Sequence, residues 1–228
     1  MNKKRLFTSI LAIVSVVAIS VGGYTYREAI HSRIARTAAV VTGQEFKPLL
    51  DSESRYIRQI VAKDNSTSRT IMWQSDSSEV DAVIEYRLVD SDDIKTLSAT
   101  DTAFTDDGST TYIHEATITG LEPNTKYEYR VGYSTDRRSD WYPLETAGAS
   151  EYEVLIYPDS QSGDYSGWEQ IVKTSAKRNP DAALYISMGD LVDNGEQAYQ
   201  WRTWLDSIKP LSARIPLALH WAITRCIR

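Results

Sequence analysis

The stretch Met188-Gly189-Asp190-Leu191-Val192-Asp193-Asn194-Gly195 decides which fold this sequence predicts. It follows the run 182–187, which is short, apolar and partly aromatic or β-branched, and therefore predicts a buried strand. Two glycines then interrupt the chain around two carboxylates and an amide. Ligands of open α/β sheets bind beyond the carboxyl ends of the strands, and hard cations prefer oxygen donors. The stretch therefore predicts a candidate metal ligand, Asp190, at a strand end.

A second strand end carries a similar pattern earlier in the chain. Residues 153–157 predict a strand, and Asp159 follows directly after Pro158. Two neighbouring strand ends that each deliver an aspartate suit a two-metal site, in which cations about 3.5–4 Å apart share a bridging carboxylate. Aspartate and glycine are also common turn residues, and a turn needs no metal. A single Gly-Asp pair favours the turn, whereas the two strand ends together favour the metal site.

Residues 153–217 resemble the opening of a calcineurin-like metallophosphoesterase of the kind related to purple acid phosphatases. The resemblance implies that Asp159 binds one metal, that Asp190 bridges two metals, and that Asn194 supports the Asp190 loop. It also implies hydrolysis of phosphate esters with two metal ions, which could be Fe, Zn or Mn. Residues 150–217 are therefore expected to form the truncated opening of a metallophosphoesterase domain.

The sequence departs from that family in several places. Many members have a histidine where this chain has Gln161, whose amide oxygen could replace that ligand, and purple members have an iron-binding tyrosine where it has Asp193. The later Gly-Asn-His-Glu/Asp and Gly-His-x-His motifs are absent from the sequence. We therefore assign no catalytic residue, and we expect weak or no metal binding by the candidate ligands Asp159, Asp190, Gln161 and Asn194.

The elements between and after these strands predict a parallel sheet. Apolar residues at helical spacing mark two helices, and Pro210 is expected to end the second one. Residues 215–219 would begin a third strand, so strands and helices alternate as in a parallel α/β sheet. The expected buried positions on the two helices are Trp168, Ile171, Val172 and Ala176, and Trp201, Trp204, Leu205 and Ile208.

Residues 51–149 predict an all-β sandwich, because short strands alternate with turn-rich segments. The segment 121–127 resembles the tyrosine corner of fibronectin type III domains, so Tyr127 is assigned a structural role. His114 is interpreted as a packing or surface residue. Purple acid phosphatases carry a similar sandwich before their catalytic domain. The expected strands are 57–62, 69–74, 82–88, 111–119, 126–133 and 141–146.

The N-terminus predicts export. Residues 3–5 are basic, and the uncharged run 6–26 is long enough, at about 1.5 Å per residue, to cross a bilayer. Residues 1–26 are therefore a signal peptide or a membrane anchor, and 27–50 a juxtamembrane spacer. The remainder is expected outside the cytoplasm, secreted or held at the membrane by that segment if it is not cleaved.

The composition is that of a globular protein, with 42% hydrophobic and 25% charged residues among 228. The formal net charge of −6 argues against a nucleic-acid partner, which would need a basic face. A phosphate ester would need bound metal to overcome repulsion from such a chain.

Residues 218–228 are interpreted as an out-of-frame tail. One permitted coding of 221–227, read in a shifted frame, gives Gly-Asn-His-Glu-Val-His, the motif expected at this place. The chain is accordingly expected to be a truncated and crippled phosphoesterase. The alternative is a non-enzymatic binding or spacer protein, anchored or secreted, built on the β-sandwich.

Overall fold

The computed structural model describes residues 54–75, 81–106, 109–133, 137–148, 151–162, 165–195 and 197–219. The predicted signal or anchor segment, the juxtamembrane spacer and residues 220–228 of the predicted tail lie outside this part. Within the described residues, no helix is both long and apolar enough to cross a membrane.

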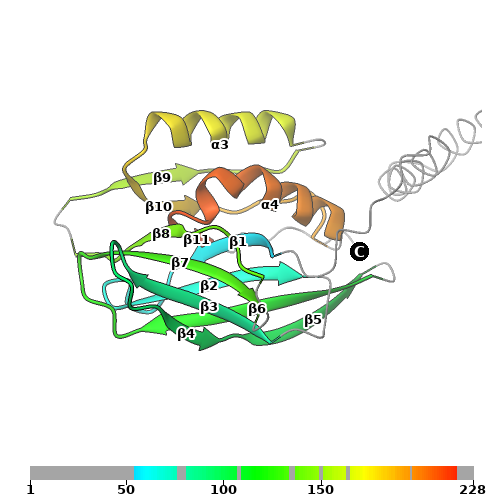
Figure 1. The fold of residues 1–228 in the computed structure, drawn as a ribbon. Coiled ribbons are helices and arrows are strands. Elements are labelled where there is room, and N and C mark those ends of the chain that lie inside the picture. Colours follow the sequence, from blue (N-terminus) through cyan, green and yellow to red (C-terminus); the bar gives the residue numbers. More distant parts are fainter. Residues whose placement is uncertain are drawn as a thin grey trace, which may run out of the picture. The chain divides into compact units, whose positions relative to one another are not determined.

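Two antiparallel layers form the β-sandwich (Figure 1). Side chains of alternating positions point between the layers on the strand β2, whose buried positions alternate with half-buried ones. The predicted strands of this region are confirmed with small shifts at their ends. One layer contains β1 (Arg55–Ile60), β2 (Ser68–Ser75), β5 (Thr100–Asp106) and β6 (Ser109–Thr119), and the other β3 (Ala82–Leu88), β4 (Lys95–Ser98), β7 (Lys126–Tyr133) and β8 (Tyr142–Glu145).

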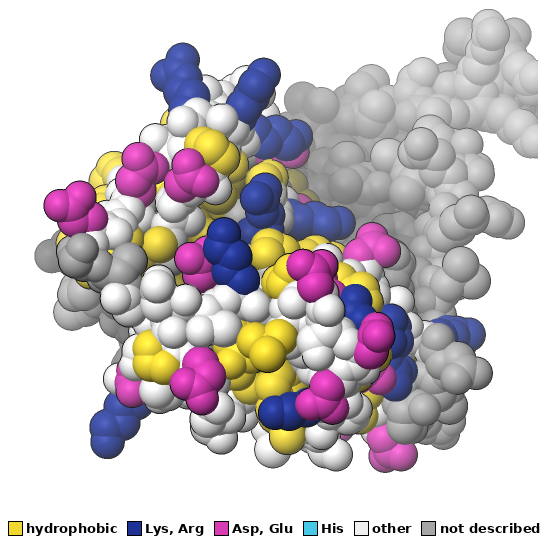
Figure 2. All heavy atoms as spheres, turned by 60° about the vertical axis from the view of Figure 1, so that its left-hand side comes forward, with side chains coloured by type: hydrophobic (Ala, Val, Ile, Leu, Met, Phe, Trp, Pro, Cys, Tyr) yellow, Lys and Arg dark blue, Asp and Glu magenta, His cyan; other side chains and the backbone are white. Residues whose placement is uncertain are grey.

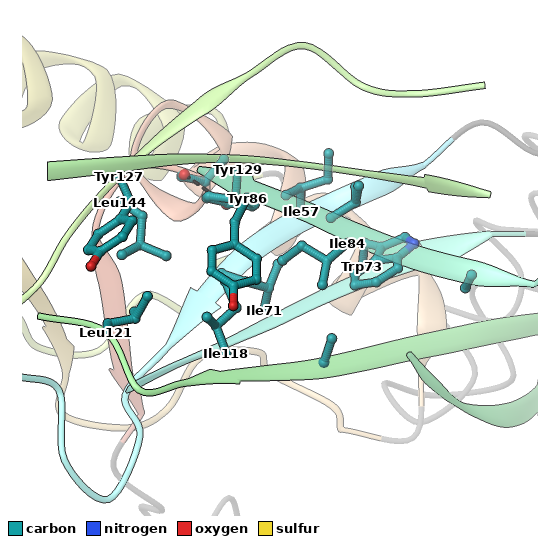
Figure 3. Packing of buried hydrophobic residues seen from close by; sticks show 14 of the residues in the cluster. Ile57, Ile71, Trp73, Ile84, Tyr86, Ile118, Leu121, Tyr127, Tyr129 and Leu144 are labelled. Carbon is teal, nitrogen blue, oxygen red and sulfur yellow. Dashed lines mark hydrogen bonds between the residues drawn. The ribbon is translucent and has the colours of Figure 1, made fainter. Parts of the chain in front are cut away.

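The core of the sandwich is dense in aromatic and β-branched side chains (Figure 3). Trp73, Ile84 and Tyr129 are fully buried between the layers. At one end, the Tyr127 hydroxyl accepts a hydrogen bond from the Glu122 amide at 2.9 Å. This is the backbone contact that the tyrosine-corner motif predicts.

A parallel α/β unit follows the sandwich. The strands β9 (Glu153–Tyr157), β10 (Ala182–Ser187) and β11 (Pro216–Leu219) pair in parallel, with α3 (Ser166–Arg178) and α4 (Ala198–Ser212) connecting them. The predicted order of strand, helix, strand, helix, strand is confirmed. Both helices pack on the sheet through a second core that contains Trp168, Val172, Trp204 and Ile208.

Two details of the helix prediction are wrong. Ile171 is 54% exposed, because α3 contacts the sheet through a narrow stripe centred on Trp168 and Val172. Pro210 lies inside α4, which continues to Ser212. A proline so close to the end removes only one helical hydrogen bond, and the buried Leu211 keeps the last turn on the core.

The two parts share one sheet, which the sequence did not suggest. Strand β11 pairs in parallel with β1 of the sandwich, with Gln59 opposite Pro216. The resulting seven-stranded sheet has the order β5-β6-β2-β1-β11-β10-β9. The α/β unit therefore continues the hydrogen-bonded ladder of the sandwich and is not joined to it by a linker alone.

Candidate metal site at the strand ends

The loops after β9 and β10 are joined by backbone hydrogen bonds. The carbonyl oxygen of Asp190 accepts the amides of Ser160 at 3.1 Å and Gln161 at 2.9 Å. Because parallel neighbouring strands end at the same edge of a sheet, Asp159 and Asp190 share one rim. The structure thus brings together the two loops that carry the predicted ligands.

The β10 loop has an unusual backbone. Gly189 has φ +115° and Asp190 φ +41°, so two successive residues lie in the left-handed half of conformational space. A non-glycine residue there is uncommon, and such conformations concentrate at functional sites. The tight turn brings the Asp190 carbonyl onto the neighbouring loop.

Side chains of helix α4 form hydrogen bonds with both loops. The indole Nε1 of Trp204 donates to Ser160 Oγ at 2.9 Å, and that hydroxyl donates to the carbonyl of Leu191 at 3.2 Å. The Oε1 atom of Gln200 accepts the amide of Asn194 at 2.9 Å. Ser160, Gln200 and Trp204 are all buried, so these bonds are shielded from water.

The sequence alone did not reveal these supporting residues. Trp204 was predicted as core, which is correct, but its second role depends on where its indole N–H points. Ser160 belongs to no recognisable motif, and only its position between Asp159 and Gln161 indicates a role at the site. Asn194 is held by its backbone amide, and its side chain lies on the exposed part of the loop.

The candidate ligands are accessible but few. Asp159, Gln161 and Asn194 are exposed, and Asp190 is half-buried. Among the residues that the structure describes, no group of three His, Cys, Asp or Glu side chains is placed to hold a metal ion. The rim therefore offers oxygen donors that suit hard cations, but the described part of the chain lacks the nitrogen ligands of a complete two-metal centre.

A buried hydroxyl lies next to this rim. Ser187, the last residue of β10, is fully buried, and its Oγ has no hydrogen-bond partner within the described residues. Buried polar atoms without a partner are costly and uncommon in native proteins. The end of β10 therefore carries one buried hydroxyl whose desolvation no described contact offsets.

A second polar arrangement lies in the sandwich. His114 Nε2 is 2.7 Å from Ser75 Oγ, and His114 Nδ1 is 2.6 Å from Asp101 Oδ1. These are the atom pairs of a Ser-His-Asp triad. In a catalytic triad the serine is accessible and the aspartate is buried, whereas here the aspartate is the exposed member. The Asp101 side chain is 41% exposed, whereas Ser75 and His114 are buried at 0% and 1%. The serine hydroxyl is buried in this structure, and the three residues join the strands β2, β6 and β5.

The sandwich has a known counterpart. Residues 56–146 match the family model described as the purple acid phosphatase N-terminal domain. This segment is a purple acid phosphatase N-terminal-like domain. The match lies within the range 51–149 that the sequence assigned to the sandwich, and it supports the resemblance inferred from that domain.

Solved structures give a similar result. A purple acid phosphatase isolated from yellow lupin (Lupinus luteus) seeds is 17% identical to this chain, with a TM-score of 0.64. The alignment covers 75% of this chain and 35% of the lupin protein, so the chain spans about a third of that enzyme's length. At this identity the likeness shows the fold.

A sensor domain of the anti-sigma factor RsgI4 in Pseudobacteroides cellulosolvens also matches. It is 19% identical and covers 44% of this chain and 99% of its own length, with a TM-score of 0.32. The score is too low to support any argument about this chain.

Proposed function

We propose that this chain belongs to a metal-dependent phosphoesterase of the acid phosphatase type, in which residues 150–217 begin the catalytic domain. The observation that carries the proposal is the joined pair of loops, in which the Asp190 carbonyl accepts the Ser160 and Gln161 amides. A purple acid phosphatase N-terminal-like domain precedes these loops in the chain, which supports the same family.

Each candidate ligand has a role that its position suits. Asp159 would bind one metal ion, and the half-buried Asp190 would bridge two. Gln161 offers an amide oxygen beside Asp159, and Asn194 supports or extends the Asp190 loop. The bound metal ions, Fe, Zn or Mn, would supply a hydroxide nucleophile and neutralise developing charge on a phosphate ester.

The number of candidate metal ligands determines the activity that we expect from this chain. Within the described residues, two carboxylates and two amides fall short of the ligands that two cations need. We therefore expect weak metal binding and little turnover from the 228-residue chain itself. The alignment covers only 35% of the lupin enzyme, so that enzyme's activity and substrates are not assigned to this chain.

The N-terminal segment is the basis for the proposed location. A basic triplet followed by an uncharged run is typical of an exported protein. We propose that the sandwich and the α/β unit lie outside the cytoplasm, with the membrane as a partner wherever residues 1–26 are retained.

A non-enzymatic role remains a second candidate, because the described ligands are incomplete. In that case the sandwich would serve as a binding or spacer module. Figure 2 shows acidic and basic side chains interspersed on one face, with hydrophobic side chains between them. Exposed hydrophobic side chains of the sandwich such as Leu88 and Phe104, at 47% and 49%, are contacts that a protein partner would cover.

A hydrolysis assay separates the two candidates. The full chain is incubated with p-nitrophenyl phosphate and with Fe, Zn or Mn in turn, with and without chelator. The enzyme proposal predicts slow metal-dependent release of nitrophenol that Asp190→Ala abolishes and the matched Asp193→Ala on the same loop retains. Absence of turnover with every metal, or equal turnover by Asp190→Ala, would favour the binding module.

A further inference from the structure

We propose that helix α4 fixes the strand-end loops relative to the β-sandwich, so that Gln59 and Tyr129 of the sandwich are positioning residues for the candidate site. The inference rests on the proposed function for what the loops bind. The mechanical connection through α4 is independent of that function and can be measured without metal.

The C-terminal end of α4 is anchored inside the sandwich. The carbonyl of Ala213 accepts two hydrogen bonds from sandwich side chains, Gln59 Nε2 at 3.0 Å and the Tyr129 hydroxyl at 2.9 Å. The Ser212 hydroxyl donates to the carbonyl of Ile57 at 2.9 Å. Ala213 packs within the sandwich core, so the end of the helix belongs to both parts of the molecule.

Burying the two polar donors of the sandwich costs desolvation free energy, which packing alone would not require. Gln59 and Tyr129 are fully buried, and Gln59 also donates to the carbonyl of Pro143 at 2.8 Å. Burial raises the pKa of Tyr129 well above its usual value, so its hydroxyl stays protonated and able to donate. Apolar residues would fill the same space without desolvating polar groups. The donors instead specify one position for the Ala213 carbonyl.

The other end of α4 carries the loop contacts. Trp204 donates to Ser160, and Gln200 accepts the Asn194 amide, as described above. Trp201 Nε1 adds a bond of 2.9 Å to the carbonyl of Gly195, which ends the Asp190 loop stretch. These three side chains of α4 hold Ser160, Asn194 and Gly195, which are a neighbour of Asp159, a candidate ligand and the end of the Asp190 loop stretch.

The helix between these ends is packed against the core. Its buried side chains Trp204, Ile208 and Leu211 lie in the core against the sheet. A helix packed along its length moves as one body, since close-packed interiors transmit displacement. A change at Ala213 is therefore expected to shift Trp204 and Trp201, which lie about 2.5 and 3.3 helical turns away.

The test uses the indole N–H signals of the full ¹⁵N-labelled chain, assigned with Trp→Phe variants. Tyr129→Phe removes one oxygen at the sandwich end, and Gln59→Leu/Tyr129→Phe removes both donors to Ala213. We expect the Trp201 and Trp204 signals to shift in both variants, and more in the double variant. The matched control is Thr70→Val, which breaks the bond between Thr70 and Thr117 (2.9 Å) on the outer face of the same layer.

Two outcomes decide the inference. It is overturned if the indole signals of Tyr129→Phe superimpose on the wild type, or if Thr70→Val moves them equally. Should the double variant fail to fold, the single variant decides. Added Mn²⁺ gives the second readout, because it should broaden both signals and bind about two- to tenfold more weakly to Tyr129→Phe. Absence of broadening in the wild type contradicts the proposed function. The mechanical connection through α4 is then decided by the indole shifts alone.

Discussion

The buried histidine of the sandwich provides a prediction whose size follows from its contacts. His114→Leu removes the bonds to Ser75 Oγ (2.7 Å) and Asp101 Oδ1 (2.6 Å) at roughly constant volume. We expect the free energy of unfolding to fall by about 1–2 kcal/mol, of which the buried bond to Ser75 contributes about 1 kcal/mol and the bond to Asp101 less. The Asp101 contribution is kept small because that side chain is 41% exposed.

A double-mutant cycle isolates the buried bond. Ser75→Ala should cost about 1 kcal/mol, and the double variant should cost less than the sum by about 1 kcal/mol, because both single variants remove the same Ser75–His114 bond. The assay is urea unfolding followed by circular dichroism. Additive effects, or a loss below about 0.5 kcal/mol for His114→Leu, would refute the structural role. Labelling of Ser75 by a fluorophosphonate would contradict the conclusion that burial prevents catalysis there.

Two further predictions concern the sandwich. Tyr127→Phe should lower the free energy of unfolding by about 1 kcal/mol in urea, because the Glu122 amide loses its partner; an unchanged midpoint would contradict a stabilising tyrosine corner. Burial raises the pKa of Glu85, but hydrogen bonds and charge from Arg138 and Arg130 outweigh it, so the folded pKa lies below 4.5. Stability from this carboxylate is present above its unfolded pKa and is lost as pH falls through the lower folded value. Glu85→Gln should therefore destabilise by about 1–2 kcal/mol at neutral pH and by progressively less in acid, and a pH-independent difference would refute this account.

The sequence predicted strands best where burial leaves a pattern. Strands 82–88, 126–133, 153–157 and 182–187 were predicted with the ends that the structure has. Strands β4 and β5 were missed because most of their residues are exposed, and an exposed edge strand carries no alternation of apolar and polar residues. Their pairing depends on β3 and β6, which is tertiary context.

The candidate site was predictable only in part. Carboxylates after strands indicated Asp159 and Asp190, since strand ends and residue chemistry can both be read from sequence. The bonds of Trp204 to Ser160 and of Gln59 and Tyr129 to Ala213 join residues far apart in the chain. Such contacts depend on where α4 packs, and no local pattern encodes that. The shared sheet between β1 and β11 was missed for the same reason.

Metal binding to the strand-end loops is the most direct test of the central claim. Binding of Mn²⁺ to the full chain is measured by electron paramagnetic resonance for the wild type, Asp190→Asn and Asp193→Asn. The account predicts weak binding by the wild type and by Asp193→Asn, and its loss in Asp190→Asn. Equal binding by all three proteins, or none by the wild type, would contradict a metal site built on Asp159 and Asp190.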